Sequence, residues 1–186
     1  MRTWKQTWGG VFLGVVGAVL TLHTSATIAQ AAEPRPARAS LEESTARVRV
    51  PDVATEWPLR QAINGAHQWL EEPACQQVFS DFQALDGTVL SDVLAERQLT
   101  PQEHLGRLAF WDGSHLRQCR VPGIAFVTGP GYAIIYVCPS GFRRLTRAPR
   151  EARATVIHEV LHSLGMGENP PSPREITRQV MERCGH

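Results

Sequence analysis

Lysine is nearly absent from this sequence of 186 residues: Lys5 is the one lysine, and arginine supplies the rest of the 19 basic residues. Acidic residues number 18, so the formal net charge is only +1. A chain this close to neutrality offers no broad surface for a polyanion, which argues against nucleic-acid binding. Hydrophobic residues make up 42% and charged residues 20%, a composition that excludes a mainly disordered chain and suits one packed domain.

Several catalytic and binding motifs are also missing. The sequence has no G-x-S-x-G elbow, no phosphate-binding P-loop and no dinucleotide fingerprint, so these hydrolase and nucleotide-binding classes are not indicated. Its four cysteines include no C-x-x-C pair, which argues against a zinc site built from thiolates and favours two disulfides.

One long apolar run is present, at residues 9–22, and it follows Arg2 and Lys5. At about 14 residues it is shorter than the roughly 20 that span a bilayer as a helix. Ala29-Gln30-Ala31 then supplies the small-x-small pattern of a signal peptidase site. We therefore predict a signal peptide at residues 1–31 with cleavage after Ala31. The product is expected to be secreted or periplasmic, without a membrane span, in an oxidising compartment.

After cleavage, residues 32–56 read as a flexible tail or propeptide, because they are rich in Ala, Pro, Arg and Glu with little periodicity. Residues 57–186 are expected to form one α+β domain. Apolar spacing predicts helices over residues 59–70, 75–82 and 89–94, and a further helix that starts after Thr100. Short β-prone runs at residues 108–111, 124–127 and 132–137 predict a short, mainly antiparallel sheet, with the last two runs forming a hairpin.

The predicted hairpin also bears on the cysteines. It brings Cys119 and Cys138 close to its open end, so we prefer a Cys119–Cys138 bridge together with Cys75–Cys184. This is one of three connectivities that four cysteines allow.

The chemistry-bearing segment is His158-Glu159-Val160-Leu161-His162, within a helix predicted over residues 149–164 and ended by Gly165. Two histidines four residues apart lie on one helix face, so both imidazoles can bind a single Zn²⁺ ion. Glu159 projects about 100° further round the helix. It is thereby free to act as the general base on a metal-activated water and to protonate the leaving amine.

This segment, continued through Ser163-Leu164-Gly165, resembles the active-site helix of the zincin metallopeptidases, and the placement of Gly165 is similar to the metzincin branch. The resemblance implies a zinc-dependent endopeptidase. It also implies a sheet with an edge strand above the helix that pairs with an extended substrate, for which residues 132–137 are the natural candidate. Met181 falls inside a predicted helix, so the sequence shows no methionine turn.

The third ligand is where the sequence departs from the metzincin pattern, because Glu168 stands at the position of the third histidine. Gly165 and Gly167 would let the chain turn back to the metal. Two alternatives lie on the last predicted helix. Glu175 also fits a capping box with Ser172, and Glu182 has a spacing similar to that of the thermolysin-like gluzincins. We expect Glu168 to bind the metal.

Other polar residues are less informative. His67, His104, His115 and His186 are expected to be surface or core residues rather than ligands. A group that stabilises the oxyanion is expected in such a mechanism. Its candidates are Tyr132, Tyr136 and His115, and the sequence does not choose among them.

The sequence therefore predicts an exported, monomeric zinc peptidase that acts on peptide or protein substrates. In this prediction His158, His162 and Glu168 bind Zn²⁺ and Glu159 is the general base. The alternative is a secreted, disulfide-stabilised binding or structural domain whose zinc is not catalytic. An open coordination position distinguishes the enzyme from the alternative.

Overall fold

Four short strands form one mixed sheet in the computed structural model, which describes residues 46–186. The strands are β1 (Arg47–Arg49), β2 (Ala109–Asp112), β3 (Phe126–Val127) and β4 (Ile134–Val137), in the order β1-β2-β4-β3. β1, β2 and β4 are parallel, and β3 pairs antiparallel with β4. The α+β class and the hairpin are confirmed, but the expectation of a mainly antiparallel sheet is wrong. Helical segments link β1 to β2 and return the chain in the same direction, which yields parallel pairing.

The sheet also begins earlier than predicted, because residues 46–56 were assigned to the flexible tail. Val48 and Val50 face the interior while Arg47 and Arg49 face outward, so a two-residue alternation was present within a charged stretch. The predicted signal peptide and residues 32–45 lie outside the described residues.

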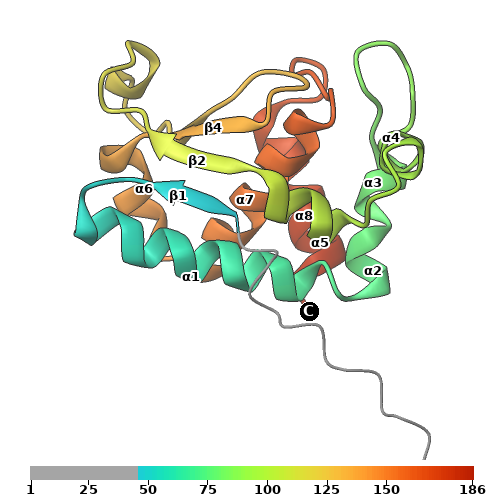
Figure 1. The fold of residues 1–186 in the computed structure, drawn as a ribbon, viewed down its shortest axis with the longest axis horizontal. Helices are drawn as coiled ribbons and strands as arrows, with labels where there is room; N and C mark the ends of the chain where they lie inside the picture. The colour runs from blue at the N-terminus through green and yellow to red at the C-terminus, as the bar shows by residue number, and fades with distance from the viewer. Residues whose placement is uncertain (1–45) are drawn as a thin grey trace, which may run out of the picture. The chain divides into compact units, whose positions relative to one another are not determined.

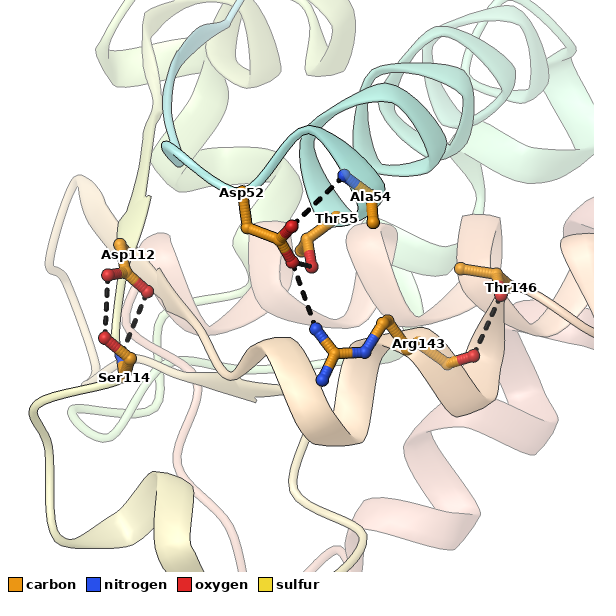
Figure 2. Close-up of polar contacts among 7 residues, drawn as sticks. All are labelled: Asp52, Ala54, Thr55, Asp112, Ser114, Arg143 and Thr146. Carbon is orange, nitrogen blue, oxygen red and sulfur yellow. Dashed lines mark hydrogen bonds and ion pairs between the residues drawn. The ribbon is translucent and has the colours of Figure 1, made fainter.

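Helix α1 (Val53–Trp69) follows β1 directly, and Asp52 provides its N-cap. Figure 2 shows the Asp52 carboxylate accepting hydrogen bonds from the Ala54 amide at 3.2 Å and the Thr55 hydroxyl at 2.6 Å. The same carboxylate accepts a third bond from Arg143, on α6, at 3.0 Å. These contacts hold the pKa of Asp52 below its usual value, with the Thr55 hydroxyl as the main cause.

The other helices agree with most of the predicted segments. The stretch 75–82 is divided between two short helices, and the capping box of Thr100 and Glu103 is confirmed. Within residues 46–186 no helix is both long and apolar enough to cross a membrane. The remaining elements are α2 (Pro73–Gln76), α3 (Val78–Asp81), α4 (Leu90–Glu96), α5 (Pro101–Arg107), the 3₁₀ helix η1 (Gln118–Arg120), α6 (Pro139–Leu145), α7 (Pro149–Ser163) and α8 (Pro173–Cys184).

Helix α7 is the centre of the hydrophobic core. Helices α1 and α7 lie on the same side of the sheet (Figure 1), and Phe110 of β2 and Ile135 of β4 are fully buried. The predicted apolar stripe of α7 is likewise buried, with exposed fractions of 0–2%. Its members are Val156, Ile157, Val160, Leu161 and Leu164. Burial on this scale fixes the helix that carries the two histidines.

Both predicted disulfides are present. Cys119–Cys138 joins η1 to the end of β4, and Cys75–Cys184 joins α2 to the end of α8, with a sequence separation of 109 residues. Each bridge therefore anchors an element that borders the histidine-bearing end of α7.

Candidate metal centre

Helix α7 ends in a tight turn that reverses the chain. Gly165 has a φ of +115°, a conformation that residues with a Cβ rarely adopt. Its N–H donates to the His162 carbonyl at 2.9 Å, and the Met166 N–H donates to the Leu161 carbonyl at 3.3 Å. These two bonds make up the Schellman motif expected at this position. The turn sends the following residues back towards His162.

The imidazoles of His158 and His162 converge, as the four-residue spacing predicts. Their Nε2 atoms lie 2.9 Å apart, and their ring centroids are 4.8 Å apart. Both residues are buried, with 5% and 6% exposed. Burial lowers the pKa of His158, which favours the neutral imidazole that binds metals.

The second nitrogen of each ring is also engaged. The Nδ1–H of His162 donates to the Met166 carbonyl at 2.8 Å, so Nε2 of the neutral ring carries a lone pair. His158 Nδ1 is hydrogen-bonded to Thr177 Oγ1 on α8 at 3.0 Å. Partners of this kind fix the orientation of metal-binding histidines. Thr177 was not predicted from the sequence. It is 19 residues from His158, and no motif of characteristic spacing links the two residues.

Glu168 completes the cluster. Its Oε1 lies 3.1 Å from His162 Nε2 and 3.4 Å from His158 Nε2, and the hydrogen bond with His158 is the main reason why its pKa is lowered. The other two candidates do not join this group. Glu175 lies in the first turn of α8, where Ser172 caps its N–H, and Glu182 forms an ion pair with Arg178 at 2.6 Å.

The three side chains fit a zinc ion. Tetrahedral coordination with bonds of about 2.0–2.1 Å places ligand atoms roughly 3.3 Å apart, close to the 2.9, 3.1 and 3.4 Å found here. Two imidazoles and one carboxylate are also a typical ligand set of catalytic zinc. Within residues 46–186 no fourth His, Cys, Asp or Glu joins the cluster. A fourth position is therefore left for a water or substrate.

Glu159 lies beside the cluster and does not belong to it. It is 8% exposed, and burial, assisted by the charge of Glu168, raises its pKa to about 8. Burial therefore disfavours the ionised carboxylate, so Glu159 holds a proton more strongly than an exposed carboxyl group does.

A cavity of about 310 Å³ opens over the cluster and is bordered by Glu159, His162 and Glu168 on one side. The facing wall is β3 with its flanking residues, including Phe126 and Thr128. β3 is the edge of the sheet on this side, so the assignment of the edge to residues 132–137 is wrong. Those residues include β4, which lies between β2 and β3. The preceding β-prone run forms β3, which pairs with β4 on the side away from β2.

The β3–β4 turn is attached directly to the metal-binding helix. The Gly131 N–H donates to the His162 carbonyl at 2.8 Å. The edge strand and the second histidine therefore keep a fixed separation.

None of the three candidates for stabilising an oxyanion borders this cavity. Tyr132 is 67% exposed, and the Tyr136 ring packs edge-on against His115 with centroids 6.0 Å apart. The cavity instead contains the amide of Gln118 and the hydroxyl of Thr128. Sequence reasoning missed both, because η1 and β3 approach the cluster only through the fold.

The loop over residues 82–88 supports the turn that carries Glu168. The Leu85 N–H donates to the Gly165 carbonyl at 3.0 Å, and a Cβ on Gly165 would lie 3.0 Å from that of Ala84. The Leu85 side chain lies where Gly167 would carry a Cβ. Gly165 is therefore required by its backbone conformation and close packing, whereas a side chain at position 167 would displace the exposed Leu85 side chain.

Of the remaining histidines, His104 contacts helix α7 next to His162, through Ser163. Its Nε2 is 2.8 Å from Ser163 Oγ, which itself donates to the Val160 carbonyl at 2.7 Å. Since the hydroxyl proton is used in this way, Nε2 of His104 is the donor. Burial lowers the pKa of His104 to about 4.

Comparison of the chain with known protein families, with curated proteins and with solved structures finds no significant match. What the fold and site define is an α+β protein in which one helix and the turn after it present a His-His-Glu group able to hold a metal ion. The zincin resemblance rests on these residues alone.

Proposed function

We propose that this protein is an exported zinc-dependent peptidase. The observation that carries the proposal is the convergence of His158, His162 and Glu168, with His162, Glu168 and Glu159 all lining one cavity. The open side of the cluster favours catalysis over a closed structural zinc site, which uses four protein ligands. Two disulfides, which form in oxidising compartments, support export.

In the proposed mechanism His158, His162 and Glu168 hold the ion, and Thr177 and the Met166 carbonyl keep the imidazoles in position. Zinc in such a site acts as a Lewis acid and activates water near neutral pH. Glu159 accepts the proton released from the attacking water and transfers it to the nitrogen of the leaving amine.

The edge position of β3 provides for substrate binding. An extended peptide can pair with an exposed strand edge through main-chain hydrogen bonds. A peptide so placed would lie beside Phe126 and Val127, which line the same cavity as Glu159. The Thr128 hydroxyl donates to the Ile134 carbonyl at 3.1 Å, so the amide of Gln118 is the neutral donor we propose for a carbonyl oxygen whose charge increases during the reaction.

The direct test is the Glu159→Gln variant. General acid–base groups contribute about 10²–10⁴-fold to rates, so we expect this variant to keep its zinc and fold and to lose at least 100-fold in peptide cleavage. Cleavage is followed with an unfolded protein substrate by mass spectrometry, after removal of the signal peptide. Glu175→Gln serves as the control, because Glu175 lies outside the cluster. Full activity in Glu159→Gln would contradict the proposed role.

A further inference from the structure

A second hollow lies on the outer face of the sheet, away from the candidate metal centre. The register aligns Arg47 of β1 with Ala109 of β2 and Ile134 of β4. Side chains alternate between the two faces of a sheet, and the alternate residues Phe110 and Ile135 are fully buried. The face that carries Arg47 is therefore the one opposite helices α1 and α7.

Three arginines surround this hollow of about 230 Å³: Arg47, Arg49 and Arg107. Its apolar part is supplied by Trp111 and Ile134, with the small Ala109 between the strands.

The arginines of the hollow have no ion-paired acid among residues 46–186. Within this part of the chain no carboxylate lines the hollow, and none of the three arginines forms an ion pair. Glu103 is one helical turn before Arg107, but its carboxylate accepts from the amide and hydroxyl of Thr100.

Of the twelve other arginines among residues 46–186, four pair with acids at 2.6–3.0 Å and eight form no ion pair within this part of the chain. These pairs are Arg60–Glu56, Arg143–Asp52, Arg178–Glu182 and Arg183–Asp81. What distinguishes Arg47, Arg49 and Arg107 is that all three line one hollow without an ion pair among residues 46–186.

One of the three is also held in place. The guanidinium carbon of Arg49 lies 5.7 Å from the Trp111 ring centroid, a cation–π distance. The Trp111 ring in turn packs edge-on against Tyr136, with centroids 6.3 Å apart. A guanidinium positioned in this way binds an oxyanion with a smaller loss of side-chain freedom.

From these observations we infer that the hollow is a binding site for a small polyanion, a single molecule that carries two or more carboxylate or phosphate groups. Guanidinium groups bind both kinds of oxyanion through paired hydrogen bonds. The apolar surface of Trp111 and Ile134 accommodates the carbon frame of an organic ligand. This site is independent of zinc and of peptide cleavage.

The test is isothermal titration of the mature, metal-free protein with citrate and, separately, with pyrophosphate. Metal-free protein is used because both probes also bind zinc. We expect saturable binding of at least one probe. Each of Arg47→Ala and Arg107→Ala should weaken it roughly tenfold or more, since each removes charge-assisted hydrogen bonds. The affinity of Arg107→Lys should lie between those of the wild type and Arg107→Ala, because lysine keeps the positive charge but loses the paired hydrogen bonds of the guanidinium group.

The control is Arg144→Ala, which removes an exposed arginine of α6 that does not line the hollow. It should bind like the wild type. Citrate binding without pyrophosphate binding assigns a carboxylate ligand, and the reverse assigns a phosphate ligand. Absence of binding by both, or equal weakening by Arg144→Ala, overturns the inference. So does binding only of a long Glu-rich peptide, which would indicate a protein partner. None of these outcomes bears on the proposed peptidase.

Discussion

His158 on α7 and Thr177 on α8 are joined by a hydrogen bond of 3.0 Å between Nδ1 and Oγ1. Thr177 is the one side chain of α8 that reaches the cluster through a hydrogen bond among the described residues, and the Cys75–Cys184 disulfide anchors that helix. The orientation of the His158 imidazole thus depends on a helix that begins fifteen residues later, at Pro173.

Replacing Thr177 by Ala should weaken zinc binding. The loss of such a partner typically costs 10–100-fold in metal affinity, and we expect a change in this range by competition with a chromophoric chelator. Thr177→Ser should retain most of the wild-type zinc affinity, because serine keeps the hydroxyl group. The matched control is Thr155→Ala on α7, since Thr155 Oγ1 donates to the Glu151 carbonyl on the exposed side of that helix. Equal zinc affinity in Thr177→Ala and Thr155→Ala would contradict the role of Thr177.

Gly165→Ala tests the turn that carries Glu168. The change places a Cβ at a φ of +115° and 3.0 Å from Ala84, so it should distort the turn and lower zinc affinity roughly tenfold or more. Gly123→Ala is the control, because Gly123 also has a positive φ, +94°, but nothing lies within 4 Å of its Cβ position. Both variants should lose stability to urea, and only Gly165→Ala should lose zinc affinity. The same affinity loss in both would show that backbone strain, and not the turn, is responsible.

The buried His104 predicts how stability depends on pH. Its pKa is about 4 in the folded protein and near 6.5 when unfolded, so the unfolded chain takes up the proton first as the pH falls. Stability should therefore decrease from pH 6.5 to pH 4, by about 3 kcal/mol from this group. In His104→Gln, which keeps a donor for Ser163, that part of the slope should vanish in urea unfolding of metal-free protein. The exposed His186→Gln variant should retain it, and an unchanged slope in His104→Gln would refute the assignment.

Much of the fold was predictable where a local pattern carried the information. The α7 stripe, the Gly165 stop, the Thr100 cap and the β3–β4 hairpin all follow from residues within a few positions of each other. The strand pairing was harder to predict, because parallel partners lie far apart in the sequence. Val48 of β1, for example, is aligned with Phe110 of β2. Such contacts leave no local signal, and the short β1 was concealed in a charged stretch.

The same contrast applies to the site. The histidine spacing predicted the convergence of His158 and His162, and the turn glycines pointed to Glu168 among three glutamates. Thr177 and Gln118 could not be found in this way, because they reach the cluster from α8 and η1 through tertiary packing.

The zinc content of the purified protein tests directly whether His158, His162 and Glu168 hold one zinc ion. Protein expressed from the full-length sequence and purified without chelators should contain about one zinc per chain by mass spectrometry of the metal. Glu168→Ala should contain far less, while Glu175→Ala and Glu182→Ala should match the wild type. A wild-type protein that neither contains zinc nor binds it when supplied, or a Glu168→Ala variant with undiminished affinity, would contradict the account.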